Sequence, residues 1–236
     1  MNEIFSRTEA ILGKDAMKKL KNSSVAIFGL GGVGSAAFEA LVRSGVGKIH
    51  VFDYDTVSAT NLNRQLLATT KTIGKLKTQA ALDRAKEINS DTQVITHEMF
   101  YLPENAEEID MREFDYIIDA VDTVTAKLEI ISRAKKAERP IISCMGTGNK
   151  MDITKLKVSN ISDTTQCPLS RVMRKELRNR RITDLNVVWS DEKPFSAHDT
   201  GELKGERPAP ASAIFVPVAA GLLLAQTAVE NIINSK

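Results

Sequence analysis

Between Gly29 and Gly34 the sequence GLGGVG has the spacing of a phosphate-binding loop. Gly29, Gly31 and Gly34 satisfy the pattern G-x-G-x-x-G, with Gly32 as a fourth glycine in the same loop. Glycines allow a tight turn and a close approach of the backbone to phosphate, and helix N-terminal N–H groups then face the anion. Asp53 follows 19 residues after Gly34, where a carboxylate accepts hydrogen bonds from ribose hydroxyls. The pattern predicts a nucleotide site but leaves NAD, FAD and ATP open.

Polar and cationic residues beyond this loop favour a triphosphate. Asp55, Asn61 and Arg64 lie in the segment DYDTVSATNLNRQ, and Lys77 follows it. A triphosphate that loses pyrophosphate needs cationic groups for the developing negative charge, whereas a dinucleotide is held mainly by backbone N–H groups. Taken singly, Arg64 could be a surface charge and Lys77 a solvated helix residue. Together they predict ATP as the nucleotide, with all four residues in its site.

Two carboxylates in the segment DAVDT, Asp119 and Asp122, come at the end of a predicted strand. Hard cations such as Mg²⁺ prefer carboxylate oxygens. Both residues are therefore placed to hold Mg²⁺. The alternative is that Asp122 only caps the following helix.

The elements that must position these groups alternate between strand and helix. The apolar strand Ser24–Phe28, the glycine loop, a helix over 33–44 and the strand Lys48–Phe52 make a βαβ unit, which implies parallel strands and a right-handed crossover. Further elements follow in alternation: helices over 74–89 and about 123–137, and strands over 93–98, 115–119 and 140–144. The predicted fold class is α/β, a doubly wound, mostly parallel, Rossmann-like sheet.

The pattern changes after Gly148. We expect strands over 155–159 and 186–189, a helix over 168–181 with proline in its first turn, and a final apolar helix over 212–233. The stretch 190–210 has no apolar period and is predicted to be a structureless lid or insertion. We treat residues 1–236 as a single domain, with a nucleotide-binding core over 22–148 and a substrate-facing extension over 149–236.

A basic stripe marks the predicted helix 168–181. Residues 167–181 carry six Arg or Lys against Glu176 alone, while the whole chain has a formal net charge of only +2. Four of the cations share one helical face, and an apolar stripe lies beside them: Arg171, Arg174, Lys175 and Arg178, then Leu169, Val172, Met173 and Leu177. Such a face suits the phosphate backbone of RNA, although it could also be an ordinary solvated surface.

Composition limits the class of protein. Hydrophobic residues are 42% and charged residues 26%, which excludes a disordered or collagen-like chain. The two cysteines, Cys144 and Cys167, form no CxxC pair and favour a reducing, cytoplasmic compartment. Cys144 is expected to be a buried thiol rather than a nucleophile. The charged start predicts no signal peptide, and the apolar run over 211–225 is shorter than the roughly 18 to 20 residues that cross a bilayer, so no membrane is expected.

Four segments of the chain have the order and spacing of a known signature: GLGGVG, SGVGKIHVFDYDTVSATNLNRQ, GKLK and DAVDT. Over about residues 7–148 the chain resembles the ThiF-type, ubiquitin-activating-like (HesA/MoeB/ThiF) adenylyltransferase family. That resemblance implies that Asp53 holds the ribose, that Asn61, Arg64 and Lys77 engage the phosphates, and that Asp122 binds Mg²⁺. It also implies an enzyme that activates a carboxylate as an acyl-adenylate and releases pyrophosphate.

The resemblance has a further consequence for assembly. Arg7, in IFSRTEAIL, is similar to an N-terminal arginine that reaches into the site of the partner subunit in this family. A homodimer with Arg7 as a catalytic residue in trans is therefore expected.

One segment narrows the choice within the family. MGTGNKMDITKLKVSNISDTTQCPLSRVMRKELR resembles the branch that cyclises threonylcarbamoyladenosine beside the anticodon of tRNA. This implies tRNA carrying that nucleoside as substrate, with ATP and Mg²⁺, and a sulfur-relay or desulfurase protein as a possible partner. Two alternatives stay open: activation of the C-terminal glycine of a ubiquitin-like sulfur carrier, disfavoured by the missing CxxC pairs, and a non-catalytic nucleotide-sensing or sulfur-relay scaffold. An NAD-dependent oxidoreductase ranks last.

Overall fold

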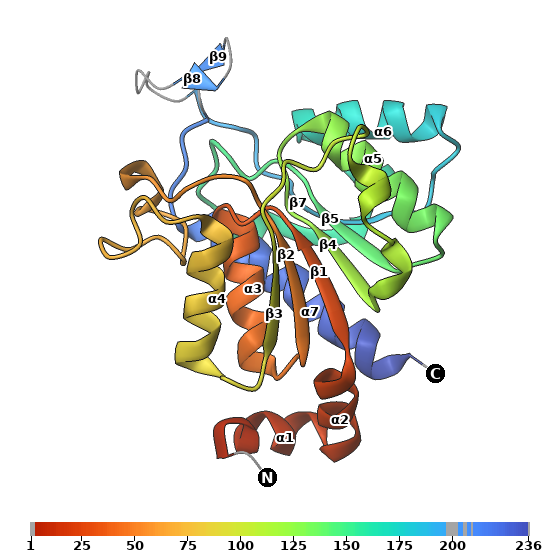
Figure 1. Ribbon diagram of the computed structural model, residues 1–236. Coiled ribbons are helices and arrows are strands. Elements are labelled where there is room, and N and C mark those ends of the chain that lie inside the picture. The colour runs from red at the N-terminus through yellow and green to blue at the C-terminus, as the bar shows by residue number, and fades with distance from the viewer. Residues whose placement is uncertain (1–2, 197–202, 205–206, 209, 236) are drawn as a thin grey trace.

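A seven-stranded sheet forms the centre of the molecule in the computed structural model, which describes residues 3–196, 203–204, 207–208 and 210–235 (Figure 1). The strand order is β3-β2-β1-β4-β5-β7-β6, parallel except for β6, which runs antiparallel to β7. The strands are β1 Ser24–Phe28, β2 Lys48–Phe52, β3 Gln93–His97, β4 Tyr116–Asp119, β5 Ile141–Cys144, β6 Leu156–Asn160 and β7 Asn186–Ser190.

Helices cover both faces of this sheet. The covering helices are α3 Gly32–Ser44, α4 Lys77–Ile88, α5 Val124–Lys136, α6 Pro168–Asn179 and α7 Phe215–Asn234, while α1 Ser6–Leu12 and α2 Lys14–Asn22 lie at one end of the sheet (Figure 1). Phe38 of α3 and Leu224 of α7 share one hydrophobic cluster with Ile27 of β1. On the opposite face, Leu128 of α5 and Met173 of α6 cluster with the strand side chains that point to that face. Two layers of helices therefore enclose the sheet.

The strands are apolar because they are buried on both faces. Four of the five residues of β1 and of β2 are buried, as expected for central parallel strands under helices on each side. Parallel strands end at the same edge, and each of β1, β2 and β4 is followed there by a predicted functional segment. This carboxyl edge is the place where ligands bind in open α/β sheets.

The C-terminal helix α7 is a core element. It is long and apolar enough to cross a membrane by length and composition alone, a test that the core helix of a soluble protein also passes. Val216, Ala220, Leu224 and Ala228 are buried along one face. At Gly221 an added Cβ would lie 2.7 Å from the Cβ of Ala36, so α7 packs directly on α3. The predicted buried helix is thus confirmed.

The predicted fold class is confirmed, and most differences lie at the ends of elements. The helix expected over 74–89 begins at Lys77, and two N-terminal helices, α1 and α2, were not predicted. Residues 197–202, 205–206 and 209 of the stretch expected to be structureless lie outside the described residues. Within its described part, β8 Leu203–Lys204 pairs antiparallel with β9 Arg207–Pro208, so the expectation is wrong there.

Candidate nucleotide-binding site

The glycine loop joins β1 to α3 at the carboxyl edge of the sheet. Gly29 has φ +89°, and an added Cβ would lie 2.9 Å from the carbonyl oxygen of Ala120, so the loop is pressed against the chain that follows β4. At Gly31, the N-cap of α3, an added Cβ would meet nothing within 4 Å. Open space at the N-terminus of a 13-residue helix fits a phosphate group.

Asp53 ties the end of β2 to this loop. One of its carboxylate oxygens accepts the backbone N–H of Leu30 at 2.6 Å, and the other accepts that of Asp55 at 2.9 Å. Burial, with only 8% of the residue exposed, raises the pKa of Asp53, although Lys77 and these two N–H groups act in the opposite direction. Two carboxylate oxygens provide about four acceptor positions, so two stay available for ribose hydroxyls.

Lys77 lies between two carboxylates. Its Nζ is 2.7 Å from an Asp55 oxygen and 3.8 Å from an Asp53 oxygen, and only 5% of the residue is exposed. The alternative of a solvated helix residue is therefore wrong. Its ammonium is held at the carboxyl edge beside the predicted ribose position, where it can attract phosphate oxygens.

Arg64 also lies beside the glycine loop. An added Cβ at Gly32 would lie 3.5 Å from its Cγ, while its guanidinium donates to Thr60 O at 2.9 Å and to Asn63 Oδ1 at 2.8 Å. Asn61 shapes the same segment, because its Oδ1 accepts the N–H of Ser58 at 3.1 Å. The structure thus brings Arg64 to the loop, whereas Asn61 is placed only within its own segment, and the contacts of both residues with phosphates stay predictions.

The two carboxylates of DAVDT have different environments. Asp119 is fully buried, 2.9 Å from the Lys127 ammonium, and accepts the Ser143 hydroxyl at 2.5 Å. The expectation that Asp119 is placed to hold Mg²⁺ is therefore wrong, since both partners belong to the protein interior. Asp122 lies beyond the strand in the exposed turn before α5. The role of Asp122 as metal ligand stays a prediction.

Arg7 lies far from the glycine loop of its own chain. Its neighbour Phe5 packs near the far end of α3, where an added Cβ at Gly45 would lie 3.5 Å from the Phe5 ring. The glycine loop is at the opposite end of that helix, which is about 20 Å long at 1.5 Å per residue. Figure 1 shows α1 at the end of the sheet away from the loop.

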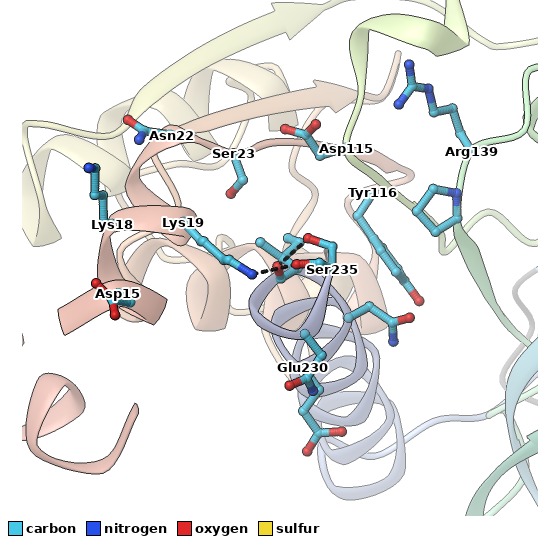
Figure 2. Close-up of a pocket in the computed structure, with 14 residues that line it drawn as sticks. Asp15, Lys18, Lys19, Asn22, Ser23, Asp115, Tyr116, Arg139, Glu230 and Ser235 are labelled. Carbon is cyan, nitrogen blue, oxygen red and sulfur yellow. Dashed lines mark hydrogen bonds between the residues drawn. The ribbon is translucent and has the colours of Figure 1, made fainter. Parts of the chain in front are cut away.

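A crevice of about 1030 Å³ lies at that amino-terminal end, between α2, the start of β4 and the end of α7 (Figure 2). Lys19 projects into it and donates to the carbonyl oxygens of Ile233 and Ser235, which close the last turn of α7. None of the predicted site residues line the crevice. We place the functional site at the carboxyl edge, because ligands bind at this edge in open α/β sheets and the predicted polar and cationic residues lie there.

The predicted basic stripe is only partly exposed. Arg171, Lys175 and Arg178 face solvent, but the Arg174 guanidinium turns inward and donates to the carbonyl and hydroxyl oxygens of Thr164. On the same helix Val172, one of the four residues of the predicted apolar stripe, is 45% exposed, so the stripe is not buried along its whole length. Met173 and Leu177 of that stripe are buried, Leu169 is partly buried, and Ser170 completes the buried face.

Both cysteines are buried near a buried lysine. Burial raises the pKa of Cys144 to about 12, which agrees with a structural thiol. Lys150 is 3% exposed and donates to the carbonyl oxygen of Ser190 at 2.9 Å, and burial lowers its pKa.

Among the described residues there is no group of three or more His, Cys, Asp or Glu that could hold a metal ion.

Sequence reasoning missed the partners of Asp119. Lys127, one turn into α5, and Ser143, in β5, are buried against it. The spacing of eight residues between Asp119 and Lys127 was visible in the sequence, but nothing there indicated that both side chains point inward.

A glycine loop, an acid on the second strand and clustered cations at the carboxyl edge define a nucleotide-binding enzyme of the ThiF class. The ThiF family model matches residues 5–234, and the chain belongs to that family. It is 40% identical over 230 residues to tRNA threonylcarbamoyladenosine dehydratase of Bacillus subtilis, covering 93% of this chain and 91% of the relative. Structures of Escherichia coli TcdA, a tRNA N6-threonylcarbamoyladenosine dehydratase, with ATP and with AMP match with TM-scores of 0.89 and 0.90 at 27% identity, over 98% of this chain and 94% of those chains.

Proposed function

We propose that this protein uses ATP to cyclise threonylcarbamoyladenosine in tRNA, with net loss of water. The single observation that carries the proposal is the group of Asp53, Asp55 and Lys77 beside the glycine loop. A buried ammonium next to a ribose-binding carboxylate suits a nucleotide that loses pyrophosphate. The similarity to dehydratases over nearly the full length of both chains supplies the substrate class.

The reaction takes two steps. A carboxylate oxygen of the threonyl group attacks the α-phosphorus of ATP. The new oxygen–phosphorus bond gives an acyl-adenylate, and the bond between the α-phosphorus and the leaving pyrophosphate breaks. A nitrogen or oxygen within the same modified side chain then attacks the acyl carbon and expels AMP. The second step is intramolecular, so its effective molarity is high, and neither a carrier protein nor a thioester is needed.

The residues of the chain divide this work. N–H groups at the start of α3 hold phosphate oxygens, and Asp53 fixes the ribose. Lys77 and Arg64 stabilise the charge that grows on the leaving pyrophosphate. Residues 149–236 present the tRNA substrate to this edge.

Mg²⁺ fits the same site as a further component. The exposed Asp122 carboxylate follows β4 and supplies the oxygen ligand that a hard cation prefers. The ion would neutralise charge on the phosphates when it is bound.

A homodimer accounts for the position of Arg7. The arginine lies at the far end of α3 from its own glycine loop, so it serves a nucleotide site only in a second copy. Two-fold symmetry would then give two equivalent composite sites. A tRNA substrate favours a cytoplasmic location, and a sulfur-relay or desulfurase partner stays a prediction.

The test is to incubate the purified protein with ATP and tRNA bearing threonylcarbamoyladenosine, and to weigh the digested nucleosides. We expect the modified nucleoside to lose the mass of one water and ATP to yield AMP and pyrophosphate. tRNA lacking the modification is the control and stays unchanged. Pyrophosphate exchange that depends on a ubiquitin-like sulfur carrier would support the first alternative, and ATP binding without any exchange would support a scaffold.

Contact with tRNA is assigned to the exposed part of the basic stripe. Changing Arg171 and Arg178 to Ala should weaken tRNA binding and flatten the salt slope by about two units, one for each lost phosphate contact. Lys86→Ala on α4, on the opposite face of the sheet, is the control. An unchanged affinity and slope in the double variant would make the stripe a solvated surface.

A further inference from the structure

We propose that Lys127 and Ser143 are positioning residues of the nucleotide site, which act through Asp119 to fix the turn 120–122 against the glycine loop. The proposal rests on the proposed function, because that function places this turn in the adenylation centre. It assigns a role to a buried polar cluster that the reaction itself does not use.

The cluster is a closed set of three side chains from three elements. Lys127 Nζ donates to Asp119 Oδ2 at 2.9 Å and to Ser143 Oγ at 3.2 Å, and Ser143 Oγ donates to the same Asp119 oxygen at 2.5 Å. All three residues are fully buried. One carboxylate oxygen of Asp119 is therefore held from two directions.

The second oxygen of Asp119 acts on the backbone. Asp119 Oδ1 accepts the N–H of Val121 at 3.2 Å, two residues further along the chain. An aspartate that bonds the backbone two residues on sets the geometry of a turn. Because Lys127 and Ser143 fix the carboxylate, they also fix this turn and the start of the segment that carries Asp122.

The turn lies directly on the glycine loop. An added Cβ at Gly29 would be 2.9 Å from Ala120 O and 3.1 Å from Val121 N, and one at Gly34 would be 3.4 Å from the Ala120 Cβ. Ala120 N also donates to Phe28 O at 2.8 Å, at the last residue of β1. A shift of the turn would displace the loop that holds phosphate.

Stability alone does not account for these charges. Removing two ions from water is costly, and apolar side chains of similar volume often replace a buried ion pair without loss of stability. Lys127 is also the fourth residue of α5, near the positive end of the helix dipole, which disfavours a cation. Stability does not require this cluster, and the cluster adjoins the nucleotide loop. We therefore infer that its role is to fix the geometry of the turn.

The experiment compares Ser143→Ala, Lys127→Met and Lys127→Arg in the full chain with Arg133→Met. Arg133 is the matched control, because it forms a partly buried ion pair with Glu129 on the same helix, away from the turn. The readouts are site-resolved amide exchange of Val121 without nucleotide, and the kcat and KM of ATP–pyrophosphate exchange.

We expect Ser143→Ala and Lys127→Met to lose protection of the Val121 amide and to lower kcat by about 10- to 100-fold, the scale for a small misplacement of reacting groups. KM for ATP should rise in the same two variants, because the turn presses on the loop that holds phosphate. Lys127→Arg should restore most of kcat, and Arg133→Met should resemble the parent. If Lys127→Met does not fold, Ser143→Ala decides.

Two results would overturn the proposal: parental protection and kcat in folded Ser143→Ala, or an equal loss in Arg133→Met. A parent without pyrophosphate exchange would refute the proposed function instead. In that case the Val121 amide alone decides whether Lys127 and Ser143 fix the turn.

Discussion

Replacing Lys77 with methionine tests the site most directly, because it removes one buried charge and keeps the volume of the side chain. At 3.8 Å and an effective dielectric constant of about 20, the attraction between Lys77 and Asp53 is about 4 kcal/mol before desolvation is counted. Asp53 keeps its two backbone N–H partners, so we expect a net loss of about 1–3 kcal/mol in the free energy of unfolding at neutral pH.

The loss should depend on pH in a defined direction. Burial raises the pKa of Asp53 above its unfolded value of about 3.9, so this group stabilises the fold when protonated, and that stability is lost as pH rises through the folded pKa. In the parent, Lys77 opposes this rise in the pKa of Asp53. Lys77→Met therefore raises that pKa further and extends upward the pH range over which the stability is lost. The difference from the parent in urea unfolding should therefore be largest at neutral pH and shrink towards pH 4.

The same variant should lower the rate of ATP–pyrophosphate exchange by about 100- to 1,000-fold, the usual effect of losing one electrostatic group at a developing charge. Lys75→Met is the control, because Lys75 pairs with Asp83 on the surface, where such pairs contribute about 0–1 kcal/mol. Exchange in Lys77→Met within threefold of the parent, or an equal loss in Lys75→Met, would refute the reasoning.

Three further outcomes are expected. Asp53→Ala should weaken ATP binding in calorimetry by about 1.5–3 kcal/mol, the range for a hydrogen bond to a charged group, and unchanged affinity would remove Asp53 from the ribose site. Arg7→Ala mixed with Asp122→Ala should regain roughly a quarter of parental activity through mixed dimers with one intact site, and a strictly monomeric protein would end this idea. His50 forms a hydrogen bond with His97 at 3.1 Å, and burial lowers the pKa of His50 to about 4. The free energy of unfolding should therefore fall by about 3 kcal/mol from pH 6.5 to pH 4. His50→Gln should flatten this pH dependence, and an unchanged dependence would contradict the assignment.

The sequence alone was sufficient for the features that depend on local spacing. A strand, a glycine loop, a helix and a second strand ending at Asp53 follow one another within about 30 residues, so their order fixes a parallel βαβ unit. Parallel strands share one carboxyl edge, and the residues that follow each strand must gather there. Lys77 and Arg64 do lie at that edge, and their roles towards a nucleotide stay predictions.

Only the tertiary structure decided which polar groups are available at that edge. Asp119 and Asp122 are both carboxylates at the end of one strand, and they differ because Lys127 and Ser143, from two other elements, enclose only the first. Arg174 fits a surface stripe by periodicity, yet Thr164, ten residues earlier, binds its guanidinium. Periodicity gives the face of a helix on which a residue lies, but not what packs against that face. The partner of such a face depends on contacts between segments that are distant in the chain. Those contacts form only when the whole sheet is assembled.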